Sequence, residues 1–209
     1  MNINPFIGVA GNIGVGKTTF TEVVAEKFKW KPIYESVIDN PYLDDFYSDM
    51  DRWSFNLQIY FLNHRFSNQL KLESGEFGFI QDRTIYEDKE IFARNLYKLG
   101  FMSGRDWKSY SNLFINMVQF LKKPDLIVYL RAETDTLISR IKKRNRDFER
   151  EIDVEYLHAL NIAYDKWINN INDINVLKVE TDSFNIFKDK DYLNKIYNMI
   201  RSKLDEELY

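Results

Sequence analysis

Short apolar runs and longer amphipathic stretches alternate along the whole chain. The clearest helix signal is Trp53–Leu72, because apolar residues recur there at three- and four-residue spacings. The run Asp125–Leu130 is nearly all apolar, as expected for a strand that is covered on both faces. The pattern predicts strands at Pro5–Ala10, Lys31–Tyr34, Phe77–Asp82, Asp125–Leu130 and Asn175–Val179. It predicts helices at Thr19–Phe28, Trp53–Leu72, Glu87–Lys98, Ser103–Lys122, Thr134–Arg144, Val154–Asn170 and Tyr192–Leu204, and a short helical or looped piece at Pro41–Tyr47.

Strands that alternate with helices predict an α/β fold, with a five-stranded parallel sheet that is flanked by helices. We expect residues 1–209 to form a single domain, because this length suits one hydrophobic core. Ligands of such sheets bind beyond the carboxyl ends of the strands. Polar residues stand at three of these predicted ends, namely Glu35, Asp82 with Arg83, and Arg131.

Residues 11–18 read GNIGVGKT, which is a complete P-loop pattern between a predicted strand and a predicted helix. Its glycines let successive backbone N–H groups turn toward phosphate oxygens, and the helix directs its positive end at the same anion. Lys17 is expected to reach the β- and γ-phosphates, and the Thr18 hydroxyl is expected to ligate Mg²⁺. The predicted ATP-binding residues here are Gly11, Asn12, Ile13, Gly14, Val15, Gly16, Lys17, Thr18 and Thr19.

Composition narrows the class of protein. The chain is 44% hydrophobic and 29% charged, as in ordinary globular proteins, and its net charge of −3 does not suggest a nucleic-acid or anionic-membrane surface. The lack of cysteine excludes disulfides and thiolate metal sites. No apolar run is long enough to span a membrane, and the first strand begins by Pro5, so we expect a cytosolic protein without a signal peptide. Aromatic residues make up 16%, and some of these rings are expected to stack on a flat heterocyclic ligand.

The polar residues at two strand ends are candidates for catalysis. Glu35 is expected to face the P-loop, where a carboxylate could take a proton from an attacking hydroxyl or hold Mg²⁺. Asp82 follows an apolar run, as a Walker B aspartate does, and could orient Mg²⁺ or its water shell. Arg83 could clamp a phosphate or the catalytic carboxylate. A solvated strand-end glutamate and a surface ion pair are the alternatives.

A third candidate is the basic segment RIKKRNRDFE, which begins at Arg140. Arg140 and Arg144 share one helix face, and Arg146 follows where the helix is expected to end. Three arginines near a P-loop are typical of a lid, here at about residues 144–151, that covers the phosphates and stabilises transition-state charge. The alternative is a solvated basic helix end.

Five motifs, GNIGVGKTTF, YES, FYSDMDRWSFNLQIYFLNHR, DRTIYED and RIKKRNRDFE, stand in the order and spacing of one known family. In these motifs the chain resembles the deoxyribonucleoside kinases, which include deoxycytidine, deoxyguanosine and bacterial deoxyadenosine kinases, from about residue 5 to residue 204. The resemblance implies a P-loop kinase fold and transfer of the γ-phosphoryl group of ATP to a deoxynucleoside 5′-hydroxyl. Deoxyadenosine is the expected acceptor, followed by deoxyguanosine or deoxycytidine.

The resemblance also implies roles for the strand-end residues. Glu35 is similar to the family's general base, and Arg83 to the residue that holds that carboxylate and the 5′ oxygen. The family's usual Glu-Arg-Ser reads Asp82-Arg83-Thr84 here, as in bacterial members. The shorter arm of Asp82 favours contact with Mg²⁺ through water over direct ligation. Lys17 completes the expected catalytic set.

For the nucleoside, the resemblance assigns Tyr47 and Glu149 to the sugar 3′-hydroxyl. Gln58 resembles the residue whose amide makes two hydrogen bonds to the base edge, and a carboxamide can indeed donate and accept there. Arg65 and Asp88 resemble a charged pair found where the base carries polar groups. This pair suits purines and cytosine and disfavours thymine.

The remaining family features are an aromatic wall, a donor loop and a dimer. Phe92 is expected to pack on the base, opposite an aromatic side chain of Phe55–Phe61. The segment Asp182–Lys188 resembles the loop that holds the donor adenine. A homodimer is expected through the two long helices, Trp53–Leu72 and Ser103–Lys122.

Two other functions compete with this interpretation. A nucleoside monophosphate kinase, such as a thymidylate kinase, also has a P-loop, an Asp-Arg motif and a lid, but it needs extra cationic contacts for the acceptor phosphate. A GTPase-type switch needs Asp-x-x-Gly and Asn-Lys-x-Asp motifs. The sequence has neither, since Asn194-Lys195 continues with Ile196-Tyr197.

Overall fold

The computed structural model describes residues 4–34, 40–70, 77–146, 149 and 152–205. Its strands form one parallel sheet in the order β2-β3-β1-β4-β5, which confirms the expected α/β fold. The strands are β1 (Phe6–Gly11), β2 (Lys31–Ile33), β3 (Phe79–Asp82), β4 (Leu126–Arg131) and β5 (Asn175–Glu180). Strand β1 lies in the middle and is buried along its whole length, which explains its continuous apolar sequence.

Helices connect the strands and cover both faces of the sheet. They are α1 (Lys17–Phe28), α2 (Leu43–Ser48), α3 (Met50–Leu70), α4 (Ile85–Glu87), the π-helical turn η1 (Asp88–Ala93), α5 (Arg94–Lys98), α6 (Gly104–Val118), α7 (Thr134–Arg144), α8 (Val154–Asn170) and α9 (Lys190–Asp205). The predicted helices are all present, but several ends differ. Helix α3 begins three residues before Trp53, and α6 ends at Val118 and not at Lys122.

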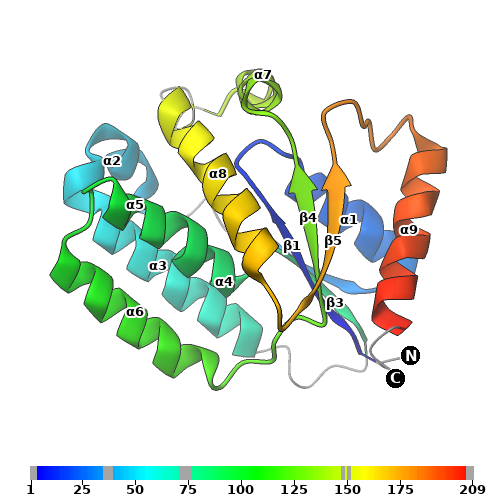
Figure 1. Cartoon of the computed structure of the whole chain (residues 1–209), viewed down its shortest axis with the longest axis horizontal. Coiled ribbons are helices and arrows are strands. Elements are labelled where there is room, and N and C mark those ends of the chain that lie inside the picture. Colours follow the sequence, from blue (N-terminus) through cyan, green and yellow to red (C-terminus); the bar gives the residue numbers. More distant parts are fainter. Residues whose placement is uncertain (1–3, 35–39, 71–76, 147–148, 150–151, 206–209) are drawn as a thin grey trace.

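Two hydrophobic cores hold the helices against the sheet. In Figure 1, α1 and α9 lie on one side of the sheet and α3, α6 and α8 lie on the other, while α7 lies beyond the carboxyl ends of the strands. The first core joins side chains of α1, α7 and α9 to the sheet, as Phe20, Leu137 and Ile196 illustrate. The second joins α3, α6 and α8. None of the described helices has both the length and the apolar character needed to cross a membrane.

The segment from α4 to α5 is one continuous helix that contains a π turn. The backbone N–H of Arg94 donates to the carbonyl of Lys89, five residues earlier, and this spacing defines the wider turn. The sequence pattern predicted a regular helix over Glu87–Lys98, since hydrophobic periodicity does not register one extra residue in a turn. The π turn carries Asp88 and Phe92, which both line the main cavity.

Candidate active site

The P-loop follows directly from β1 and leads into α1. Gly14 has a φ of +84° and Gly16 a φ of +101°, both in the region that favours glycine. A Cβ on Gly14 would lie 2.7 Å from a side-chain carbon of Ile141 on α7, so the loop packs closely under that helix. The Lys17 Nζ donates to the carbonyls of Gly11 at 2.9 Å and Asn12 at 3.0 Å. The lysine is therefore already folded over the loop.

Beside the P-loop, Thr18 and Asp82 are in contact. The Thr18 hydroxyl donates to Asp82 Oδ2 at 2.5 Å. The Asp82 side chain is almost completely buried, and its other oxygen, Oδ1, has no hydrogen-bond partner among the described residues. A buried carboxylate oxygen with this neighbour fits a hard cation or a water that is bound to one.

Arg83 follows β3 and is held by its backbone as well as its side chain. Its φ is +67°, a conformation that costs a non-glycine residue about 1 kcal/mol or more. Its backbone N–H donates to the Val9 carbonyl at 3.0 Å. Its guanidinium carbon lies 4.2 Å from the centre of the Phe92 ring, within the range of a cation–π contact. An observed strain of this kind is common at functional positions.

A cavity of about 880 Å³ lies at the carboxyl edge of the sheet. Its described lining contains six lysine or arginine side chains against three aspartate or glutamate side chains, which favours an anionic ligand. Most of the predicted site residues line it, namely Ile13, Gly14, Gly16, Lys17, Thr18, Thr19, Tyr47, Gln58, Asp82, Arg83, Asp88, Phe92, Arg140, Arg144, Arg146 and Glu149. Gly11, Asn12, Val15 and Arg65 do not, and lie behind the lining.

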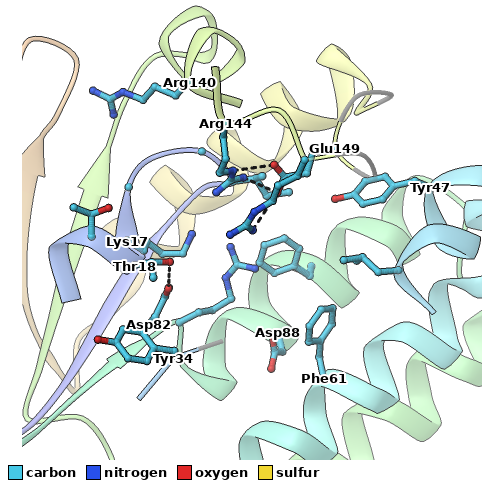
Figure 2. Close-up of a pocket in the computed structure, with 18 of the residues that line it drawn as sticks. Lys17, Thr18, Tyr34, Tyr47, Phe61, Asp82, Asp88, Arg140, Arg144 and Glu149 are labelled. Carbon is cyan, nitrogen blue, oxygen red and sulfur yellow. Dashed lines mark hydrogen bonds and ion pairs between the residues drawn. The ribbon is translucent and has the colours of Figure 1, made fainter. Parts of the chain in front are cut away.

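The three arginines of the basic segment do not act alike. Arg144 makes two hydrogen bonds to the buried carboxylate of Glu149, at 2.9 and 2.5 Å, and Arg146 lies 3.7 Å from the same carboxylate. Arg140 instead donates to the carbonyls of Val15 and Thr181. Figure 2 shows it apart from the other labelled residues, directed away from Lys17. Burial lowers the pKa of Arg140, which nonetheless stays charged at neutral pH.

The far end of the cavity is lined by polar and aromatic side chains. The Gln58 side chain is buried, and its Oε1 has no hydrogen-bond partner among the described residues. Asp88 Oδ2 accepts from Arg65 Nε at 2.5 Å, and both side chains are almost fully buried. Phe61 of α3 lines the cavity on the same side as Asp88 (Figure 2). An unsatisfied amide oxygen in such a pocket suits a ligand that donates a hydrogen bond.

Two strand-end residues need separate mention. Glu35 falls outside the described residues, but its neighbour Tyr34 lines the cavity. Arg131 at the end of β4 is not part of the cavity lining. It pairs with Glu133 at 2.8 Å, with Asp165 at 3.3 Å and with Glu180 at 3.4 Å. The side chain of Arg131 therefore belongs to a network of ion pairs at the surface and not to the cavity.

Sequence reasoning overlooked several residues at the site. Tyr156 of α8 lines the cavity, and the buried carboxylate of Glu87 lies directly behind the P-loop. Phe187 also lines the cavity, but it belongs to the segment Asp182–Lys188 that the resemblance assigns to the donor adenine. Glu87 could have been found from the spacing Thr84-x-x-Glu87, which matches a helix capping box. Tyr156 carried no signal beyond its helical periodicity.

Comparison with known proteins gives the family. The family model for deoxynucleoside kinase matches residues 7–205. This chain belongs to the deoxynucleoside kinase family. It is an ATP-dependent phosphotransferase that acts on deoxynucleosides, as the five motifs predicted, and it has the P-loop kinase fold. This membership sets aside both the monophosphate kinase and the GTPase-type switch.

Individual relatives agree with the family. The chain is 38% identical to the deoxyadenosine/deoxycytidine kinase of Bacillus subtilis over 97% of its own length and 94% of that protein. It is 40% identical to the deoxyadenosine kinase of Dictyostelium discoideum, over 85% and 73% of the two chains. The solved deoxyadenosine kinase of M. mycoides with bound dCMP and dCDP superposes with a TM-score of 0.84 at 32% identity, over 94% of this chain and 99% of that one.

Proposed function

We propose that this kinase prefers deoxyadenosine as acceptor, with deoxyguanosine or deoxycytidine next, and ATP as donor. The observation that carries the proposal is the buried, unsatisfied Oε1 of Gln58 beside the Arg65–Asp88 pair. The adenine 6-amino group is a donor that an amide oxygen can accept from, and the Gln58 amide nitrogen can donate to a ring nitrogen in return. Relatives named deoxyadenosine kinase support the same preference.

The donor phosphates are proposed to bind at the P-loop. Phosphate oxygens would replace the carbonyls of Gly11 and Asn12 as partners of Lys17, and the loop N–H groups would complete the cradle. Thr18 and Asp82 would hold Mg²⁺, the latter directly or through a water molecule, since Asp82 Oδ1 is free of other described partners. When bound, this ion would neutralise charge on the phosphates.

Phosphoryl transfer is proposed to rely on one base and a set of arginines. Glu35 takes the proton of the 5′-hydroxyl, and Arg83 binds the 5′ oxygen and that carboxylate. Arg144 and Arg146 stabilise charge on the transferring group from the lid side. Both arginines contact Glu149. Glu149 and Tyr47 are in turn proposed to bind the sugar 3′-hydroxyl. Arg140 and Asp182–Lys188 are proposed to border the donor adenine, as Phe187 on the cavity wall suggests.

A homodimer through α3 and α6 is proposed because both helices expose apolar side chains. Leu70, Leu113 and Ile115 are all exposed on these helices. Replacing Ile115 with glutamate should give a monomer by light scattering, whereas the same change at the exposed Ile162 of α8 should leave the mass unchanged.

A cytosolic location is proposed from the absence of cysteine in the chain. Recovery in the soluble fraction after cell fractionation tests it.

Steady-state kcat/KM with the four deoxynucleosides tests the acceptor. Deoxyadenosine should give the highest value and thymidine the lowest. The four deoxynucleoside monophosphates, assayed in parallel, should consume no ATP. Highest activity with thymidine would refute the preference, and turnover of the monophosphates alone would refute the proposed reaction.

A further inference from the structure

Glu87 is a buried carboxylate that the proposed mechanism does not use. It ends α4, has no exposed surface, and lies behind the P-loop and not in the cavity lining. One of its oxygens, Oε2, accepts from the backbone N–H of Thr84 at 2.9 Å and from the Thr84 hydroxyl at 3.4 Å. These contacts are those of an ordinary helix cap. They account for only half of the carboxylate.

The other oxygen, Oε1, joins three separate parts of the fold. It accepts from the backbone N–H of Gly11 at 3.4 Å and from the Tyr164 hydroxyl of α8 at 2.8 Å. It also lies 3.8 Å from Nε of Arg83. Gly11 begins the P-loop, and Arg83 is the arginine proposed to bind the 5′ oxygen. A single side chain therefore spans the donor site and the acceptor site.

The contacts around Arg83 form a closed ring. Glu87 contacts Arg83, the Arg83 guanidinium lies over the Phe92 face, and the Phe92 ring meets Tyr164 nearly perpendicularly at 6.4 Å between centres. The Tyr164 hydroxyl closes the ring by donating to Glu87. Each member of this ring is buried. An arginine fixed from two sides has little freedom to reorient.

A buried ion pair is poor evidence for added stability, because desolvation offsets most of the attraction. Burial does raise the pKa of Glu87, while Arg83 and Lys17 oppose that rise. A helix cap alone could be supplied by an exposed residue without this penalty. The arrangement is therefore better explained by the geometry that it imposes on Arg83 and the P-loop.

We propose that Glu87 is a positioning residue that fixes the Arg83 guanidinium relative to the P-loop and thereby sets the rate of phosphoryl transfer. This inference rests on the proposed role of Arg83. Misplacement of a catalytic group by about 1 Å can lower a rate by about 10²-fold without loss of substrate binding. Glu87 contacts neither substrate directly, so its removal should act on kcat and leave both KM values nearly unchanged.

The test is Glu87→Gln, which keeps the size of the side chain but removes its charge. We expect kcat with deoxyadenosine to fall by about 10- to 100-fold, with KM for ATP and deoxyadenosine within about threefold of wild type. Glu87→Asp, which keeps the charge on a shorter arm, should recover part of the rate. The matched control is Tyr129→Phe. Tyr129 stacks on Tyr164, and its hydroxyl donates a hydrogen bond to Asp165. It makes no hydrogen bond to Glu87, so the kcat of Tyr129→Phe should equal that of wild type.

A double-mutant cycle separates positioning from general structure. In an Arg83→Ala background, Glu87→Gln should lower kcat no further, because the group that it positions is gone. If Glu87→Gln does not fold, Tyr164→Phe takes its place in the same cycle. A kcat within threefold of wild type, or an equal loss with and without Arg83, would overturn the proposal.

The proposed function is tested separately with the wild-type enzyme. If wild type turned out to phosphorylate another acceptor, the acceptor assignment would fail, and the same cycle would be run with that acceptor. The positioning role of Glu87 would then be decided only by its coupling to Arg83 in that double-mutant cycle.

Discussion

Arg65 and Asp88 form a buried ion pair whose removal can be followed in stability and in substrate choice. The pair is 2.5 Å long, and each side chain exposes only a few per cent of its surface. Removing one partner leaves the other charge buried, which costs about 3–5 kcal/mol. Arg65 also donates to the Arg83 carbonyl at 2.9 Å, so Arg65→Met removes this hydrogen bond as well, at a further cost of about 1 kcal/mol.

The double variant Arg65→Met/Asp88→Ala removes both charges together. Only the loss of the hydrogen bond to Arg83 and a small loss of packing then remain, so the double variant should lose less stability than Arg65→Met alone. Urea denaturation of wild type, both single variants and the double variant gives the coupling directly. The matched control is the exposed pair Lys123–Asp173, 2.6 Å long, whose removal should cost about 1 kcal/mol or less.

Substrate choice provides the second measurement. The double variant has a roomier and less polar pocket, so the ratio of kcat/KM for thymidine to that for deoxyadenosine should rise. Any disturbance of Arg83 lowers both rates and cancels in this ratio. Single losses that simply add, or a ratio equal to that of wild type, would refute the idea that the two residues read the base as one unit.

Three further variants test other parts of the site. Glu35→Gln should lower kcat by about 10²- to 10⁴-fold while calorimetry finds unchanged deoxyadenosine binding; near wild-type turnover would exclude Glu35 as the base. Lys17→Ala should impair catalysis far more than deoxyadenosine binding, since Lys17 is proposed to contact the donor phosphates alone; lost nucleoside affinity would mean that the two substrate sites are wrongly assigned. The third test concerns pH. Burial raises the pKa of Glu87 above its ordinary value of 4.5. Between pH 4.5 and the raised pKa, the folded protein therefore binds more protons at this site than the unfolded chain does. The contribution of Glu87 to the free energy of unfolding consequently falls as pH rises through this range. Glu87→Gln removes the contribution, so its free energy of unfolding should rise relative to wild type as pH increases above about 4.5, and a difference that is flat with pH would contradict the assignment.

The features that can be predicted from the sequence are those that depend on short, continuous stretches of chain. The P-loop needs eight consecutive residues, and β1 and β4 are continuous apolar runs, so the fold and the position of the P-loop follow from local patterns. The motif around Asp82-Arg83-Thr84 likewise locates the end of β3.

Features that depend on distant contacts do not follow in this way. Glu87 meets Gly11 and Tyr164 across 76 and 77 residues, and no local pattern announces these partners. The end of β4 illustrates the opposite error, because Arg131 stands at the correct edge of the sheet yet is drawn into an ion network with acidic neighbours. Position at a strand end is thus not sufficient for a role in the cavity.

The π turn of η1 makes the shape of the pocket depend on the number of residues in one short segment. Losing one residue between positions 88 and 93 would restore regular α-helical winding with little rotation of the flanking helix, but it would displace the residues within the turn itself. The helix would become more regular, but Phe92 would leave its place under Arg83. Relatives whose chains are one residue shorter in this segment should therefore build a different pocket floor, even where every remaining amino acid is the same.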